Sequence, residues 1–413
     1  MAGDSDSSSE DRGSIESGTS GSFGDSFTET THRSWGERLM SSLVGALVGL
    51  ALTGGSIIGL FWNEGRAVQT HRSLNEGASA VVAIDPSKID PVNEKKLIHA
   101  SAPLVAAGTL RDPDTGLALP GLRLERAVET YQWVEKTETR RQKNVGGSEE
   151  TVTTYTYVKE WHGGRVDSGR FKQPGGHQNP EPILKPATFV AEQATFGAFK
   201  PGQHVVRAAP GLTAVRPEPG QIEALRARYG VKVHLADDHI YVAANPQSPE
   251  VGDTRIIYRI VRNGPFSIVA MQTGSDLSPY QTRAGDRLLM VRAGTKSATE
   301  MFAAAKSDNT ILTWVLRGVG ALVMLIGFSL VLNPLVTLGD VVPFIGTIVG
   351  WGTGLVALFL TLIGASLTIA VAWFWYRPLV AVAVLAAGGV LAYLTGRLGA
   401  SRKAAPTTSP VRA

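Results

Sequence analysis

Two histidines and two aspartates fall within six residues, at His234, Asp237, Asp238 and His239. Imidazole and carboxylate groups in one short segment are the ligand types that suit zinc or a similar cation. Asp237-Asp238 also has the composition of a tight turn between two short apolar runs. Such a turn places the two histidines on its flanks, where they need not converge. The turn is the better explanation, so we assign no metal ligand and no cofactor.

Other reactive constellations are absent from the sequence. The chain has no cysteine, which excludes disulfides, thiolate nucleophiles and cysteine-ligated metals. Gly176-His177-Gln178-Asn179-Pro180 could bind a ligand in a loop. Asn-Pro also initiates turns, and a histidine can order a loop by hydrogen bonding to it, which is the interpretation we favour. Trp133 is a structural candidate in the same domain. We assign no catalytic residue and expect that the chain is not an enzyme.

A polar motif, Asn63-Glu64-Gly65-Arg66, directly follows a long apolar segment. Glu64 and Arg66 could pair with each other or with lipid headgroups, or fix the following domain to the bilayer. No activated nucleophile accompanies them, so a structural junction is the favoured interpretation. Arg377-Pro378 ends another apolar run, and Arg377 is expected to act as a headgroup anchor.

Arg317 is the only charge inside a predicted membrane span. A charge at that depth is costly and suggests a functional site by default. Its long side chain could also reach the interface from about two turns inside the span. No acidic residue lies within a predicted span to form an ion relay, so transport around Arg317 is only the alternative function.

The elements that position these residues are mostly membrane helices. Residues 39–62 contain no charge, and at 1.5 Å per residue they cross a hydrocarbon core of ~30 Å. Further apolar segments follow at 311–332, 346–376 and 379–394, giving four predicted spans. Residues 346–376 exceed the length of one span, and Arg377-Pro378 separates them from the last segment. Gly45 and Gly49, like Gly350 and Gly354, are spaced for close helix packing, within one bundle or between copies.

The segment between the first two spans, residues 63–309, shows period-two alternation and turn signals, which predict a β-rich domain, possibly of two subdomains. Two long alternating runs, 126–141 and 150–161, flank Asn144-Val145-Gly146-Gly147, a predicted hairpin turn. The fold class is therefore α+β: four transmembrane helices with a large β-rich domain inserted between the first and second.

The two ends of the chain differ in charge. Residues 1–34 are an acidic leader predicted to be disordered, and 395–413 form a flexible basic tail. Arg33, Arg38 and the basic tail favour cytoplasmic termini and an extracytoplasmic domain, in a bacterial plasma membrane. The formal net charge of +4 is too small to indicate a nucleic-acid partner.

Five short motifs occur in order around the predicted spans: Phe61-Trp62-Asn63-Glu64-Gly65-Arg66-Ala67, Tyr131-Gln132-Trp133-Val134-Glu135, Gly176-His177-Gln178-Asn179-Pro180, Pro249-Glu250-Val251-Gly252-Asp253 and Tyr376-Arg377-Pro378-Leu379. Together they resemble the transmembrane protein 43 family, over roughly residues 35–396. The resemblance implies a four-span protein whose animal members sit in the endoplasmic reticulum and inner nuclear membrane and act as oligomeric scaffolds. It supplies no catalytic residue set, and a lamin-type partner is not carried over.

The sequence thus predicts a multi-pass membrane scaffold. It would act in a lipid bilayer through homo-oligomerisation and contacts with other membrane proteins or lipids.

Overall fold

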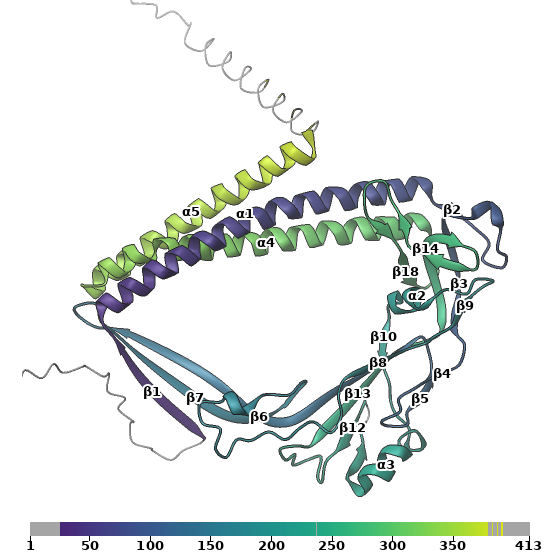
Figure 1. The fold of residues 1–413 in the computed structure, drawn as a ribbon, viewed down its shortest axis with the longest axis horizontal. Coiled ribbons are helices and arrows are strands. Elements are labelled where there is room, and N and C mark those ends of the chain that lie inside the picture. The colour runs from purple at the N-terminus through teal and green to yellow at the C-terminus, as the bar shows by residue number, and fades with distance from the viewer. Residues whose placement is uncertain (1–24, 237, 379–381, 383–385, 387–389, 391–413) are drawn as a thin grey trace, which may run out of the picture.

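The computed structural model describes residues 25–236 and 238–378, together with residues 382, 386 and 390. Three long helices form one layer, and a β-rich domain lies beside them (Figure 1). The helices are α1 (Trp35–Ala80), α4 (Ala298–Gly339) and α5 (Pro343–Tyr376). Each is long and apolar enough to cross a membrane. The predicted fourth span, 379–394, falls almost entirely outside the described residues, as does the basic tail.

Helices α1 and α4 extend well beyond their apolar segments. Helix α1 has 46 residues and continues from the predicted span through the polar residues that follow it. Helix α4 begins 13 residues before the apolar segment 311–332, at Ala298. It also continues through Pro334, beyond the end of that segment; a single proline removes only one helical hydrogen bond, which a packed helix can tolerate. Capping boxes, Ser34 with Glu37 and Ser297 with Glu300, set the two N-termini.

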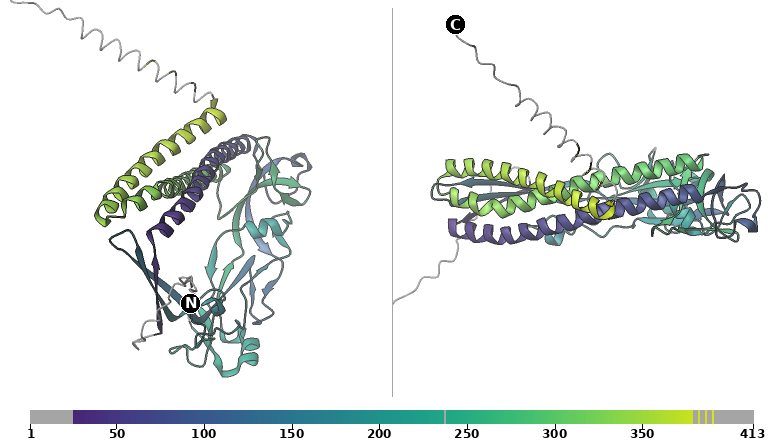
Figure 2. Two further views of the ribbon diagram at one scale, coloured as in Figure 1. Left: turned by 60° about the vertical axis from the view of Figure 1, so that its left-hand side comes forward. Right: turned by 90° about the horizontal axis from the view of Figure 1, so that it is seen from above.

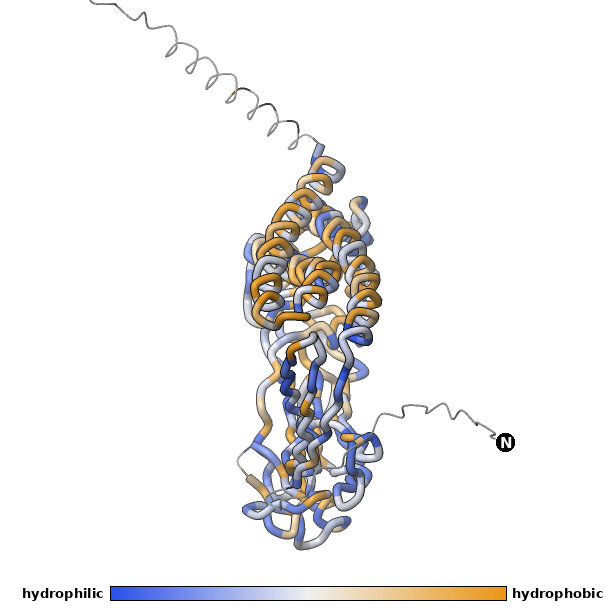
Figure 3. Tube along the Cα trace, turned by 90° about the vertical axis from the view of Figure 1, so that its left-hand side faces the viewer, coloured by the Kyte–Doolittle hydropathy of each residue, from blue (hydrophilic) through white to orange (hydrophobic). Residues whose placement is uncertain are grey.

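The antiparallel helices α1 and α4 pack closely along their lengths, and α5 returns beside them (Figure 2). The closest approach is at Gly49, where an added Cβ would lie 2.6 Å from the carbonyl oxygen of Gly327. Leu60, Met324 and Ala365 then bring one buried side chain from each helix into a small core. Most of the remaining apolar side chains on the helices are exposed, as expected of surfaces that face lipid (Figure 3).

The domain contains two main sheets. The larger has the order β1-β7-β6-β13-β12-β11, with β10 on β13 and β8 on β6; the smaller has the order β15-β14-β3-β2, with β18 on β14 and β9 on β3. Their strands, with the two short pairs β4–β5 and β16–β17, are β1 (Ser26–Arg33), β2 (Val82–Ala83), β3 (Leu97–Ala106), β4 (Thr109–Arg111), β5 (Ala118–Pro120), β6 (Arg123–Lys143), β7 (Glu149–His162), β8 (Ala187–Val190), β9 (Ala194–Phe196), β10 (Leu212–Ala214), β11 (Val233–Leu235), β12 (His239–Val242), β13 (Thr254–Val261), β14 (Gly264–Thr273), β15 (Asp276–Ser278), β16 (Tyr280–Gln281), β17 (Arg287–Leu288) and β18 (Met290–Ala293).

One continuous apolar core joins the two sheets, with Leu104, Leu124, Phe196, Tyr258 and Ile268 among its buried residues. Two short helices, α2 (Gln203–Ala208) and α3 (Glu223–Tyr229), add side chains to it. Short 3₁₀ turns lie at Pro91–Asn93, Ser168–Arg170, Pro219–Gln221 and Gly230–Lys232. A second cluster, including Leu74, Leu288 and Phe302, packs the polar halves of α1 and α4 against the domain. The domain is therefore fixed to the helices at this end.

The predicted hairpin is confirmed: β6 and β7 pair antiparallel from Thr130↔His162 to Lys143↔Glu149. The leader differs from the prediction. Residues Ser26–Arg33 are not disordered but form β1, which pairs along its whole length with β7. Its alternating Phe, Thr and Glu residues suit a strand but are too polar to stand out beside an acidic leader. The structure thus joins the segment before α1 to the inserted domain.

Candidate functional site: the polar junction between helices and domain

Glu64 lies almost completely buried where α1 leaves its apolar segment, with 2% of its surface exposed. It pairs with Arg317 of α4: the Arg317 Nε donates to Glu64 Oε1 at 2.6 Å and Nη2 to Oε2 at 2.8 Å. The indole Nε1 of Trp373, on α5, donates to Glu64 Oε2 at 2.9 Å. One carboxylate therefore binds together all three long helices.

Arg66 does not pair with Glu64, as one alternative from the sequence proposed. Residues two apart point to different sides of a helix, so the two side chains diverge. Arg66 instead donates to Asn309 Oδ1 at 2.9 Å and to Thr313 Oγ1 at 3.0 Å, both on α4. Asn63, 2% exposed, accepts from Arg66 and donates to the Thr313 carbonyl at 3.2 Å. This second network extends the α1–α4 contact toward the domain.

Gly65 provides the space in which α5 ends. A Cβ added there would meet the Tyr376 ring at 2.6 Å, so a larger residue would displace the Tyr376 side chain. Arg72 donates to the Tyr376 carbonyl at 2.9 Å. Helix α5 ends at Tyr376, just before Arg377-Pro378, as the proline predicted. The Arg377 guanidinium lies 5.7 Å from the centre of the Trp373 ring.

The predicted residues Asn63, Glu64, Gly65, Arg66, Arg317 and Arg377 therefore meet at one place, with Pro378 next in the chain. The sequence pointed to each of them but missed the partnership of Glu64 with Arg317, because Glu64 was counted outside the span. A carboxylate one turn beyond an apolar run and an arginine in the antiparallel run are the signal that could have found it. Glu64 and Arg317 are hydrogen-bonded to each other across two helices, so this pair can hold the helices together.

A second polar contact joins the domain to the opposite end of the helices. Asp340, fully buried at the α4–α5 turn, accepts from Arg38 of α1 at 2.5 Å and from Lys143 of β6 at 2.8 Å. The Gly146 amide donates to the Val341 carbonyl at 3.1 Å, and Arg38 also donates to the Gly147 carbonyl. The tip of the β6–β7 hairpin is thus held on the ends of α1 and α4.

One loop of the domain packs on strands β6 and β7 and contains or contacts four of the candidates: Trp133, His177, Asn179 and Pro180. Asn179 pairs with the backbone of Trp133 in both directions, at 2.7 Å and 2.9 Å. His177 stacks on Tyr157 with ring centres 4.0 Å apart and meets Trp133 edge-on. The phenol of Tyr157 is enclosed by this loop, and burial together with a hydrogen bond to Glu135 raises the pKa of Tyr157 to about 12. His177 thus lies between aromatic rings and bonds to the loop backbone at the Gln173 carbonyl.

The two histidines of the possible metal segment have other partners. Among the described residues no group of three or more potential ligands gathers. His234 bonds to the Ala243 carbonyl at 3.1 Å, and His239 bonds to the neighbouring Asp238. Asp237 lies outside the described residues.

Sequence reasoning missed a buried polar network inside the domain. Asp112 is fully buried, accepts from Arg126 Nη1 at 2.7 Å and accepts from the Tyr258 hydroxyl at 2.5 Å. Burial alone would raise the pKa of Asp112, but hydrogen bonds from Tyr258 and the Asp114 amide, with the charge of Arg126, outweigh it and lower the pKa. Burial and the bond to Asp112 raise the pKa of Tyr258. A network closed to solvent supports the core.

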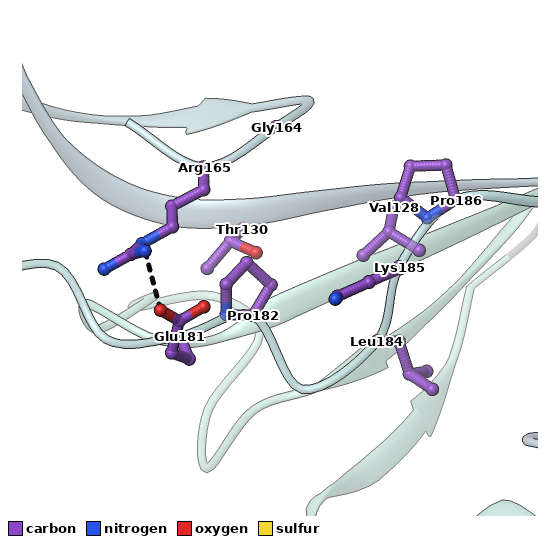
Figure 4. A pocket seen from close by; sticks show the side chains of 9 residues that line it. All are labelled: Val128, Thr130, Gly164, Arg165, Glu181, Pro182, Leu184, Lys185 and Pro186. Carbon is purple, nitrogen blue, oxygen red and sulfur yellow. Dashed lines mark ion pairs between the residues drawn. The ribbon is translucent and has the colours of Figure 1, made fainter. Parts of the chain in front are cut away.

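The domain also has a cavity of about 300 Å³ between β6 and the loop before β8. Apolar and proline side chains dominate its lining, and an Arg165–Glu181 ion pair of 2.6 Å lies at one side (Figure 4). Its lining, Val128, Thr130, Gly164, Arg165, Glu181, Pro182, Leu184, Lys185 and Pro186, contains no histidine, serine or tyrosine. Its charged groups are the paired Arg165 and Glu181, together with Lys185.

The four spaced glycines have different surroundings. An added Cβ at Gly49 would meet the backbone of Gly327 on α4, whereas one at Gly45 would have Leu330 as its nearest neighbour, at 4.0 Å. On α5, an added Cβ at Gly350 would meet only Val336, at 3.7 Å, and one at Gly354 would meet nothing within 4 Å. Gly49 therefore packs closely inside the bundle, Gly45 and Gly350 each have one ordinary neighbour, and Gly354 faces open space among the described residues.

Long apolar helices, joined to one another by a buried polar junction and packed against a β-rich domain, define an integral membrane protein. The sequence matches the family model for Transmembrane protein 43 over residues 130–378. It is 33% identical to mouse Transmembrane protein 43 over 358 residues, covering 83% of this chain and 87% of the relative. The human protein is 33% identical over 362 residues, with the same coverage, and a Drosophila melanogaster homolog is 31% identical over 369 residues, covering 85% and 94%.

The chain therefore belongs to the transmembrane protein 43 family. The resemblance drawn from the five motifs is confirmed. The relatives are named as transmembrane proteins and not as enzymes. No solved structure shows significant similarity to the chain.

Proposed function

We propose that this protein is a membrane scaffold that acts through self-association and through contacts with other membrane proteins or lipids. The observation that carries the proposal is that the domain is fixed to the helices at both ends. At one end the cluster around Leu74, Leu288 and Phe302 joins them, and at the other end the buried Asp340 accepts from Lys143 of β6. Such a frame is suited to holding surfaces at a set spacing.

Transport around Arg317, the alternative function, receives less support. The Nε and Nη2 groups of Arg317 both donate to the Glu64 carboxylate. The Arg317 guanidinium also lies over the rings of Trp314 and Trp373. A relay would need a series of titratable groups along the bundle. Glu64 with Arg317 lies near the domain end of the described helices and Arg38 with Asp340 at the other end, and the apolar segments between them carry no further charge. Arg317 thus has a structural partner that accounts for its position.

The membrane orientation remains part of the proposal. Arg33, Arg38 and the basic tail support cytoplasmic termini and an extracytoplasmic domain body, and the proposed site of action is a bacterial plasma membrane. The fourth helix over 379–394 belongs to the same proposal, because it would bring the C-terminus back to the side of the N-terminus.

Co-expression of two differently tagged full-length copies tests self-association. After extraction in mild detergent, purification through one tag should recover the other tag in a fixed ratio. Mixing of separately extracted copies is the control, since exchange after lysis would also produce recovery. Complete absence of the second tag in the co-expressed sample would refute the scaffold function in the form proposed here.

A further inference from the structure

The distal ends of three strands form a ribbon that projects from the domain: residues 26–33 of β1, 136–143 of β6 and 149–156 of β7 (Figure 1). Strand β7 is in the middle, hydrogen-bonded to β6 on one side and to β1 on the other. Over these residues, β6 and β1 have no further strand partner among the described residues, so each presents an open edge. The ribbon therefore has two open edges, on opposite sides.

The two edges match each other. Ser26 and Lys136 both lie opposite Thr156, and Arg33 and Lys143 both lie opposite Glu149. The two edges therefore end at the same level beside the hairpin tip, and residues 136–143 of β6 cover the same eight levels as β1. Both strands run antiparallel to β7, so they are parallel to each other. A copy of the protein placed beside the first can thus lay its β6 edge along the β1 edge of its neighbour.

The open edges lie beside the helix ends that are farthest from the domain core. The clamp around Asp340 holds the ribbon tip at the ends of α1 and α4 where Arg38 lies. Both ribbon faces carry threonine and charged side chains, such as Glu29 on β1 and Glu138, Arg140 and Arg141 on β6. An unpaired strand edge presents a row of N–H and C=O groups that can pair with a strand of another chain.

We propose that the ribbon is the assembly surface of this protein, with β1 of one copy pairing in parallel with the distal part of β6 in the next. The contact is heterologous, because two different edges meet, so it repeats around a ring until the sheet closes. Closure removes every open edge in one step. The proposal rests on the proposed function, since it names the surface through which the scaffold self-associates.

The absence of cysteine allows a direct test by disulfide cross-linking of the full-length protein in membranes. Thr28 and Glu138 lie at one level, both opposite Thr154. Within one copy they are separated by β7, hence by two strand spacings or about 9–10 Å. A disulfide needs Cα atoms within about 7 Å, so the variant carrying Thr28→Cys and Glu138→Cys can form that bond only between copies. A second variant, with Glu138→Cys and Thr30→Cys, tests the same contact with β1 shifted by two residues along β6.

The expected result on mild oxidation is a ladder of dimers, trimers and larger species that a reductant removes. Glu138→Cys with Thr154→Cys is the matched control: those positions face each other within one hairpin, so that variant should close internally and remain a monomer on the gel. It also shows that the ribbon folds and is accessible to the oxidant.

Three outcomes would overturn the proposal. The first is no cross-link between copies from either β1 position while the hairpin control oxidises fully. The second is a ladder or dimer from a single-cysteine variant alone, because that would show like edges meeting. The third is a cross-linked series that stops at the dimer. If differently tagged copies still co-purify in these cases, self-association stands and only the ribbon contact is wrong; if they do not, both proposals fail.

Discussion

Replacing Arg317 with methionine should destabilise the protein strongly, because it leaves the Glu64 carboxylate charged and buried. Glu64 is 2% exposed and would retain only the Trp373 indole as a hydrogen-bond donor of those that the structure shows. Removing one partner of a buried ion pair costs about 3–5 kcal/mol, most of it from the charge left behind. The cost should appear as a lower midpoint in thermal unfolding of the full-length protein in lipid nanodiscs, followed by tryptophan fluorescence.

Glu64→Gln should cost less, about 1.5–3 kcal/mol, the contribution of hydrogen bonds to a charged group. Arg317 is less enclosed than Glu64, with 14% of its side chain exposed, and can turn toward the interface once its partner is neutral. The double variant Glu64→Gln with Arg317→Met removes both charges, so it should be more stable than Arg317→Met alone. Arg259→Met, at an exposed position on β13, is the matched control and should leave the midpoint nearly unchanged.

A double-mutant cycle of Glu64→Gln and Arg317→Met shows which result would refute a stabilising role for this ion pair. Groups in direct contact show coupling energies of roughly 0.5–3 kcal/mol, whereas independent sites add within about 0.5 kcal/mol. Additive effects of the two substitutions, or an Arg317→Met variant as stable as the Arg259→Met control, would show that the pair does not hold the helices together.

Three further changes probe other contacts. Asp340→Asn should weaken both the Arg38 and Lys143 contacts, so hydrogen exchange over 141–149 should rise while 254–261 stays protected; equal protection of the tip would contradict the clamp. Gly49→Val should lower the thermal midpoint because the added side chain meets Gly327, whereas Gly54→Val, with open space around its Cβ, should have a much smaller effect; equal effects would contradict the packing. The lowered pKa of Asp112 means that the folded state binds fewer protons than the unfolded state, whose aspartate titrates near ~3.9. This stabilisation is present above that pH and is lost as the pH falls through the lowered folded pKa, so acid unfolding of Asp112→Asn should be less steep, and an unchanged slope would exclude the network as its source.

The sequence predicted features that depend on local pattern. Charge-free runs located the three described membrane segments, and Asn144-Val145-Gly146-Gly147 located the hairpin between β6 and β7. Arg377-Pro378 marked the end of α5. In each case the signal lies within a few residues and reflects hydrocarbon solubility, turn geometry or proline chemistry.

Features that depend on distant contacts were missed. Glu64 and Arg317 are 253 positions apart, and no local signal shows that they meet. Strand β1 is polar and follows an acidic leader, so its pairing with β7 could be seen only in the folded protein. The continuous helices α1 and α4 exceed their apolar segments because packing against the domain, at Leu74 and Phe302, stabilises their polar halves.

Native mass spectrometry of the full-length protein, released directly from lipid, tests the central claim of self-association most directly. The account predicts one dominant oligomer with a fixed number of copies, stable across protein concentration, together with any retained lipids and partner proteins. A monodisperse monomer, or a distribution of sizes that simply follows protein concentration, would contradict it.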